Sequence, residues 1–248
     1  MLYMDFNLKV KHVKGRGPKG EMQDVGCFGT SADDQFSWVI VCDGIGGERG
    51  GELAAKTTVK TLHTYIKKYL LNVGQLNSTD FLKDGIRQVQ KKFAAFIEKE
   101  SSLRLMGCTL CITIFTENKA YVFWSGDARC YQLRNSNCIV DTIPHNWSFD
   151  LYRKGILSLE EARLSETSWL TGSINHYNAE IRVDVEVFTV DKNDRILICT
   201  DGVWALFGHP DLIELMSTPS LENSAAHLKR ILKEHANDNY YGFLVDCL

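Results

Sequence analysis

Two Asp-Gly pairs stand at the ends of similar apolar runs. Asp43-Gly44 follows VIVC, and Asp201-Gly202 follows ILICT. A carboxylate at the end of a buried strand can project into a cleft, and the next glycine lets the chain turn tightly beside a ligand. Asp-Gly is also a common turn dipeptide, so each pair alone is consistent with a plain turn. The repetition of the pattern favours a shared site.

Two further aspartates also lie beside apolar runs. Asp127 in SGDAR comes after an apolar run, and Asp238 precedes the last one. Four carboxylates that converge without Lys or Arg repel one another strongly in a low dielectric, and a divalent cation removes that cost. Ligands that are all oxygen favour the hard ions Mg²⁺ or Mn²⁺ over zinc or copper. We therefore predict that the four aspartates surround a Mn²⁺ or Mg²⁺ site.

Apolar patterning predicts the strands that would carry these aspartates. Continuous apolar runs are typical of strands covered on both faces, and alternating runs are typical of half-buried strands. The segment 119–133, with Gly126-Asp127 at its centre, has the pattern of a hairpin. Strands are predicted at 37–42, 107–115, 119–125, 180–190, 195–200 and 241–247.

Helical periodicity appears in longer segments between the strands. Residues 51–73 and 80–100 each place apolar side chains on one stripe, which predicts a helical hairpin packed on a sheet. A capping box from Ser158 to Glu161 predicts a short helix. A final helix is predicted over 221–235. Strands interrupted by two long helices indicate the α+β fold class.

Composition excludes several classes of protein. The 248 residues include 28 Lys+Arg and 31 Asp+Glu, a formal net charge of −3 that offers no basic surplus to a nucleic-acid backbone. No apolar run approaches the ~20 residues of a membrane span, and the first residues lack a signal-peptide core. We therefore expect a cytoplasmic protein with a single domain over 1–248, and no binding to nucleic acid or membrane.

The eight cysteines do not indicate a disulfide framework, because cytosolic thiols stay reduced. Cys108 and Cys111 form a CxxC motif, which raises the alternative of a zinc site. They lie in a β-branched run, where positions three apart point to opposite faces. No second CxxC or His pair completes four ligands. We interpret both as core residues.

Six segments occur in an order found in one known family. They are VCDGIGGERGGELAA, GCTLCITIF, SGDARCYQL, LTGSIN, ILICTDGVWALF and DNYYGFLV. Together they resemble the metal-dependent serine/threonine protein phosphatases of type 2C, over about Glu21 to Val245 and in the compact form typical of bacterial members. The resemblance implies a four-layer α-β-β-α sandwich, with two packed, mainly antiparallel sheets flanked by helices.

The resemblance also implies roles for single residues. Asp43 is similar to the aspartate that bridges two metal ions, and Gly44 to the glycine whose carbonyl binds one of them. Asp201 and Asp238 resemble the remaining ligands of the first ion, and with Asp43 they would form the catalytic set. Asp127 is similar to the aspartate that holds a third, weaker ion together with Asp201.

The N-terminal motif EMQD at 21–24 resembles an acidic motif of the family. Asp24 matches its final aspartate, and Gln23 stands near the second metal where a glutamate is often found, which implies weaker binding of that ion. An Arg that contacts the substrate phosphate usually precedes this motif. Both Lys19 and Arg16 are candidates for that contact, and the sequence does not choose between them.

Two other segments bear on mechanism. Ile45 stands in DGIGG where many eukaryotic relatives have a His proposed as general acid, so the leaving oxygen would take its proton from metal-bound water or elsewhere. Residues 144–175 resemble the mobile flap of the family, and we call these residues the flap-like segment. A plain surface connection is the alternative interpretation of 144–175.

The implied activity is the hydrolysis of phosphoserine and phosphothreonine on proteins. Water or hydroxide bridging two Mn²⁺ or Mg²⁺ ions would attack phosphorus in line. The implied partners are phosphoprotein substrates, including a cognate serine/threonine kinase or its targets, and we expect a monomer. One alternative is a metal-binding pseudophosphatase that regulates a partner. Another is a nucleotide-binding glycine loop at 44–51, which lacks the Lys-Ser/Thr of a P-loop.

Overall fold

The computed structural model describes residues 8–71, 73–165 and 169–248. In chain order its elements are β1 (Leu8–Gly15), β2 (Val25–Thr30), β3 (Ser37–Cys42), β4 (Gly44–Ile45), α1 (Glu48–Tyr69), the 3₁₀ turn η1 (Val73–Asn77), α2 (Asp80–Lys99), the 3₁₀ turn η2 (Ser101–Leu105), β5 (Gly107–Cys108), β6 (Leu110–Phe115), β7 (Lys119–Ser125), β8 (Arg129–Arg134), β9 (Asn137–Asp141), α3 (Trp147–Arg153), α4 (Leu159–Leu164), β10 (Ile174–Asn175), β11 (Asp184–Thr189), β12 (Arg195–Cys199), α5 (Asp201–Trp204), α6 (His209–Met216), α7 (Leu221–His235) and β13 (Tyr240–Cys247).

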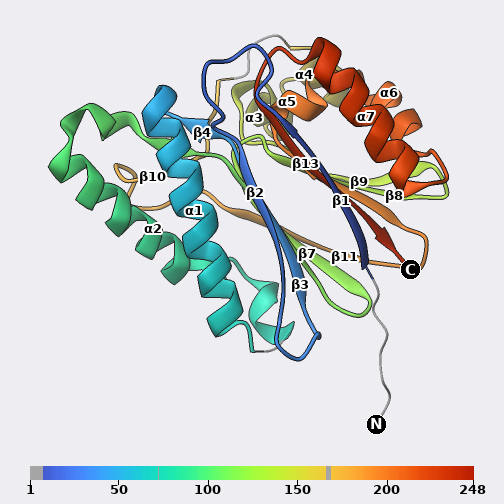
Figure 1. Ribbon diagram of the computed structural model, residues 1–248, viewed down its shortest axis with the longest axis horizontal. Helices are drawn as coiled ribbons and strands as arrows, with labels where there is room; N and C mark the ends of the chain where they lie inside the picture. Colours follow the sequence, from blue (N-terminus) through green and yellow to red (C-terminus); the bar gives the residue numbers. More distant parts are fainter. Residues whose placement is uncertain (1–7, 72, 166–168) are drawn as a thin grey trace.

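Two sheets pack face to face in the middle of the molecule (Figure 1). Within the described residues, one sheet has the order β1-β13-β12-β8-β9 and the other β11-β7-β6-β3-β2, and their neighbouring strands are antiparallel. Helices α1 and α2 cover the second sheet, while α6 and α7 cover the first. The α+β class and the layered sandwich implied by the sequence are confirmed.

Three apolar layers fill this sandwich, which explains the continuous apolar strands. On β3, Trp38 and Ile40 pack toward α1 and α2, while Val39 and Val41 pack between the sheets. Successive side chains of a strand point to opposite faces, so a strand buried on both faces is apolar throughout. A third layer lies under α6 and α7. The strand ends that precede Asp43 and Asp201 are therefore held from both sides.

The cysteines belong to these layers. Cys108 packs in the layer beneath α1 and α2, and Cys111 packs between the two sheets. Both thiols are fully buried. The prediction that they are core residues on opposite faces is confirmed.

The hairpin predicted over 119–133 is wrong. β7 pairs with β6 and β11 in one sheet, whereas β8 pairs with β12 and β9 in the other. Gly126, at φ +95°, turns the chain from one sheet to the other. Both strands are almost wholly buried, and each finds its hydrogen-bond partners in a different sheet. The crossing leaves Asp127 between the sheets' ends rather than at a hairpin tip.

Several element bounds also differ from the predictions. The strand predicted over 107–115 is broken at Thr109, and the one over 180–190 covers only Asp184–Thr189. Helix α1 begins at Glu48 rather than at residue 51, so the glycine loop passes directly into it. The predicted helix over 221–235 and the capping box at Ser158 are confirmed. None of the helices in the described residues has the length and apolar character that crossing a bilayer demands.

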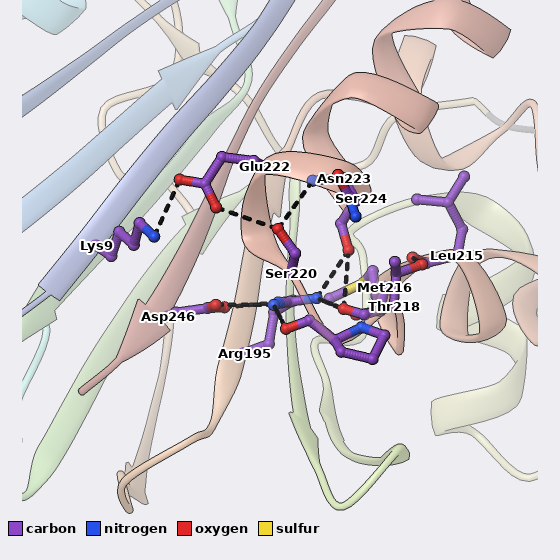
Figure 2. A network of polar contacts seen from close by, with 11 residues as sticks. Lys9, Arg195, Leu215, Met216, Thr218, Ser220, Glu222, Asn223, Ser224 and Asp246 are labelled. Carbon is purple, nitrogen blue, oxygen red and sulfur yellow. Dashed lines mark hydrogen bonds and ion pairs between the residues drawn. The ribbon is translucent and has the colours of Figure 1, made fainter.

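A buried arginine joins one sheet to its covering helices (Figure 2). Arg195 on β12 donates to both carboxylate oxygens of Asp246 on β13, at 2.6 and 2.7 Å. It also donates to the carbonyl oxygen of Met216 at 2.7 Å and to Ser224 Oγ at 2.8 Å. These bonds satisfy a carbonyl at the end of α6 and tie β12 to the Ser224 side chain in the first turns of α7. A planar, forked guanidinium can reach all of these acceptors at once.

We predict that Arg195→Lys destabilises the fold. Lysine keeps the charge but lacks the forked guanidinium, so oxygens of the Asp246 carboxylate and the Met216 carbonyl lose their donors. We expect the free energy of unfolding to fall by about 2 kcal/mol. Urea denaturation measures this. The matched control is Arg230→Lys, at an exposed ion pair with Glu234, where the change should stay below about 0.5 kcal/mol. Equal effects at the two positions would contradict the role given to Arg195.

Candidate functional site

Asp43 lies between β3 and β4, and Thr109 fixes its main chain. The Asp43 N–H donates to Thr109 Oγ1 at 2.9 Å, and the Asp43 carbonyl accepts from the Thr109 N–H at 2.8 Å. Thr109 is fully buried in the break between β5 and β6. Both bonds leave the Asp43 carboxylate free. The motifs in the sequence do not single out Thr109, whose one signal is a hydroxyl inside an apolar run.

Asp24 lies directly before β2 and is held by a threonine from the other sheet. Its Oδ2 accepts from Thr200 Oγ1 at 2.6 Å, and that hydroxyl oxygen accepts from the Tyr241 N–H at 2.9 Å. Asp24 is 3% exposed, yet no donor among the described residues reaches its Oδ1. Thr200 precedes Asp201, so this bond brings two aspartates from distant parts of the chain together.

Asp127 lies where the chain crosses between the sheets. It is 5% exposed, and no described residue donates to its Oδ1. Its carbonyl accepts from the indole Nε1–H of Trp204 at 2.9 Å. Trp204 ends the short helix α5, whose first residue is Asp201. The two aspartate-bearing turns are thus bonded to each other through Trp204.

Asp238 and Asn239 bring the N-terminal motif to the site. Asn239 is buried, its Oδ1 accepts from the Gln23 N–H at 2.6 Å, and its Nδ2 donates to the Arg16 carbonyl at 2.7 Å. Lys19 Nζ lies 3.0 Å from Asp238 Oδ2. Asp238 is half exposed, unlike Asp24. Lys19 and Arg16, the two candidates for the phosphate contact, lie in this N-terminal segment. The hydrogen bonds of Asn239 hold the segment in place.

The two candidate phosphate-binding residues point to different partners. The Lys19 amine faces the aspartates, and the hydrogen bond and charge of Asp238 raise its pKa. The Arg16 guanidinium instead donates to the carbonyl of Gly20 at 3.0 Å. Only the first of these two cationic groups therefore has a contact in the carboxylate cluster.

The glycine loop approaches the site closely. Gln23 Nε2 donates to the carbonyl of Gly47 at 3.0 Å, which ties the EMQD motif to this loop. A Cβ on Gly44 would lie 2.2 Å from the carbonyl oxygen of Gly51. A larger residue at position 44 would therefore push the start of α1 away. The half-buried Ile45 follows in β4.

Burial and mutual repulsion raise the pKa values of the clustered carboxyls. Burial is the largest cause for each group, and the neighbouring aspartates add to it. The pKa of Asp24 is raised to about 7, that of Asp127 to about 8 and that of Asp201 to about 6. The pKa of Asp43 is raised well above its usual range. After burial, the charge of Asp24 is the next largest cause of the raised pKa of Asp43.

The donor set suits a hard cation. Across the parts of the chain that the structure describes, no three His, Cys, Asp or Glu side chains stand close enough together to enclose an ion. Asp24 Oδ1 and Asp127 Oδ1 are nevertheless buried acceptors with no donor among the described residues, and unpaired buried carboxylates are costly. A divalent cation compensates such oxygens and removes their repulsion. The chemistry of the cluster therefore fits Mn²⁺ or Mg²⁺.

Comparisons with known proteins agree with this fold. A family model described as protein phosphatase 2C matches residues 21–234. The serine/threonine phosphatase stp of Listeria innocua is 27% identical over 204 residues, which cover 82% of this chain and 77% of the relative. The solved structure of the serine/threonine phosphatase Stp1 from Staphylococcus aureus has a TM-score of 0.87 at 18% identity, and covers 100% of this chain and 98% of its own.

A second solved structure contains metal. It is the catalytic domain of the serine/threonine protein phosphatase PstP in complex with two manganese ions, with a TM-score of 0.79 at 22% identity, covering 97% of this chain and 98% of its own. At these identities the two solved structures establish the fold. The family model extends over most of the sequence, and on that ground the chain belongs to the protein phosphatase 2C family, a family of phosphatases.

Proposed function

We propose that this chain hydrolyses phosphoserine and phosphothreonine monoesters on proteins, using Mn²⁺ or Mg²⁺ held by its aspartates. The observation that carries the proposal is the cluster of buried carboxyls with raised pKa values, in which Asp24 and Asp127 each keep an oxygen without a donor from the described residues. The serine/threonine phosphatases among its relatives and the manganese ions bound by PstP support it.

The aspartates at the strand ends would hold the ions. Asp43, the Gly44 carbonyl, Asp201 and Asp238 would bind the catalytic pair, and Asp127 would join Asp201 at a third, weaker ion. When bound, the ions neutralise charge on the phosphoryl oxygens and acidify water for in-line attack. The buried hydrogen bonds described above fix the main chain at Asp43 and Asp127 in advance. Such rigidity is how a preorganised site lowers the barrier.

The N-terminal motif would complete the site. Asp24 and Gln23 lie beside the second ion in this proposal, with Gln23 contributing an amide where a carboxylate is common. The bond from Gln23 to Gly47 also holds the loop that follows Asp43. Ile45 has no titratable group, so the proton for the leaving oxygen would come from metal-bound water or from another group.

The wider assignments rest on the same site. We propose one catalytic domain over 1–248, because both sheets share the apolar layer between them. The flap-like segment 144–175 would cover the site from α3 and α4. Phosphoproteins, including a cognate serine/threonine kinase or its targets, would be the partners. A monomer working in the cytoplasm remains our expectation, and the buried free thiols suit a reducing compartment.

We predict that Asp201→Asn abolishes hydrolysis of an aryl phosphate in Mn²⁺. The substitution removes a charge that binds metal while keeping the shape, so kcat should fall by at least about a hundredfold. The matched control is Asp84→Asn, at an exposed ion pair on α2, which should keep kcat within about twofold. Turnover that survives both Asp201→Asn and EDTA would overturn the proposal. Mn²⁺ binding without any turnover by the unaltered protein would favour the pseudophosphatase.

We predict that Lys19, not Arg16, contacts the substrate phosphate. Loss of a charged hydrogen bond costs about 1.5–3 kcal/mol, so Lys19→Ala should lower kcat/KM at least about tenfold. Arg16→Ala should change kcat/KM less than about twofold, because its guanidinium is directed at Gly20. Steady-state kinetics on a phosphopeptide measures both. The reverse order of effects would show that Arg16 makes the contact.

We predict that the metal-free protein loses stability as pH rises from about 4 to about 8. Unfolded aspartates have a pKa of about 3.9, whereas the folded values of Asp201, Asp24 and Asp127 are about 6, 7 and 8. The folded state therefore binds more protons than the unfolded state in this range. The stabilisation that these protons give is complete below the unfolded pKa, and it is lost as the pH rises past the folded pKa values.

Urea unfolding in EDTA at pH 5 and pH 8 tests this dependence. The free energy of unfolding should be larger at pH 5, and Asp127→Asn should shrink the difference because one titrating group is gone. Saturating Mn²⁺ should remove most of the loss at pH 8. If the same difference persists in Asp127→Asn, the raised pKa of Asp127 is wrong.

A further inference from the structure

The guanidinium of Arg129 lies between two aromatic rings from different parts of the fold. Its Cζ is 3.9 Å from the ring centroid of Trp204 and 5.1 Å from that of Phe149. Trp204 ends α5, which begins with Asp201, and Phe149 belongs to α3 of the flap-like segment. Figure 1 shows α3 and α5 at the same end of the sandwich. Arg129 follows Asp127 by two residues, so the stack joins α3 to both aspartate-bearing turns.

Arg129 depends on these rings because its polar contacts are sparse. It is 5% exposed, its Nη1 donates to the Tyr131 hydroxyl at 3.3 Å, and Nη1 lies 3.8 Å from Asp141 Oδ1. Its Nε has no hydrogen-bond partner among the described residues. A buried cation with few acceptors is stabilised by aromatic faces on either side. The position of the guanidinium is therefore set largely by Trp204 and Phe149.

Trp204 is held in two directions at once. One face of its ring contacts Arg129, and its Nε1–H donates to the Asp127 carbonyl at 2.9 Å. If Arg129 shifts, the indole can follow only by lengthening or breaking its bond to Asp127. A displacement of Phe149 would thereby reach Asp127 through three contacts, by way of Arg129 and Trp204.

The flap-like segment is anchored to the same turn at its base. The His145 N–H donates to the Gly126 carbonyl at 2.8 Å, and the Thr171 N–H donates to the His145 carbonyl at 2.9 Å. Both arms of the segment thus meet beside Asp127. The base of the flap-like segment is thus fixed beside Asp127. Helix α3 then acts on this turn through the contact of Phe149 with Arg129.

We propose that Phe149, Arg129 and Trp204 are positioning residues that couple the packing of α3 to the placement of Asp127. With α3 packed on Arg129, the stack keeps Trp204 on the Asp127 carbonyl and holds the carboxylate toward Asp201. A bound protein that displaces α3 would release the Asp127 carboxylate from this position. The inference rests on the proposed function, in which Asp127 helps to hold a cation.

The first experiment removes the remote ring. Phe149→Leu keeps an apolar side chain but loses the aromatic face, so the weakest Mn²⁺-binding step should weaken about fivefold in isothermal titration calorimetry. The kcat for an aryl phosphate at subsaturating Mn²⁺ should fall by a similar factor, with KM changed less than about twofold. The matched control, Trp147→Leu, removes a half-exposed ring from the same helix and should leave both quantities unchanged.

A double-mutant cycle separates coupling from loss of packing. Trp204→Phe keeps a ring against Arg129 but removes the N–H that holds Asp127. If the path runs through that bond, Phe149→Leu should weaken Mn²⁺ binding by less than about twofold further in the Trp204→Phe background. Independent effects that multiply would overturn the proposal, as would unchanged Mn²⁺ binding in Phe149→Leu.

The two proposals fail in different ways. An unaltered protein that binds Mn²⁺ but hydrolyses no phosphomonoester contradicts the proposed function, and the calorimetric cycle still decides the coupling. An active protein whose Mn²⁺ binding and kcat are the same in Phe149→Leu contradicts the coupling alone. Equal losses in Phe149→Leu and Trp147→Leu would attribute the effect to the helix as a whole and contradict the specific stack.

Discussion

Carboxylates that are brought together away from water repel one another, so the fold around them has to hold them rigidly. Asp43 and Asp201 follow strands that are buried on both faces, so neither backbone can retreat to solvent. Asp24 and Asp127 are themselves almost wholly buried. Bringing such groups together raises their pKa values and costs stability unless protons or a cation compensate them. A sandwich with three apolar layers provides the rigidity that keeps them in place.

The polar groups around the cluster hold main chains more than they neutralise charge. Thr109 bonds both main-chain groups of Asp43, and Trp204 bonds the carbonyl of Asp127. Asn239 does the same for the segments that carry Gln23 and Arg16. These uncharged donors and acceptors leave carboxylate oxygens unpaired, which suits a site that binds cations rather than one that forms internal ion pairs. Lys19 and Arg129 are the exceptions. Lys19 forms an ion pair with the half-exposed Asp238 at the edge of the cluster, and the charge of Arg129 acts against the rise in the pKa of Asp127.

The sequence predicted what depends on local pattern and burial. The strands at 37–42 and 195–199 and the helix at 221–235 follow from apolar runs and periodicity, and the aspartates follow from motifs at the strand ends. The hairpin over 119–133 failed because a local pattern does not say which sheet a strand joins. Thr109 was missed because its importance comes from Asp43, a distant partner in the chain. The choice between Lys19 and Arg16 stayed open because the course of the loop, not the spacing, decides which side chain faces the carboxylates.

In the function proposed for this protein, the four aspartates at the strand ends converge on shared divalent cations. A crystal structure grown with Mn²⁺ and measured at a wavelength where manganese scatters anomalously tests this most directly. We expect anomalous peaks within coordination distance of Asp43, Asp201 and Asp238, and a weaker one beside Asp127. Ordered aspartates without any peak among them, at a Mn²⁺ concentration that supports turnover, would show that these residues do not hold the catalytic ions.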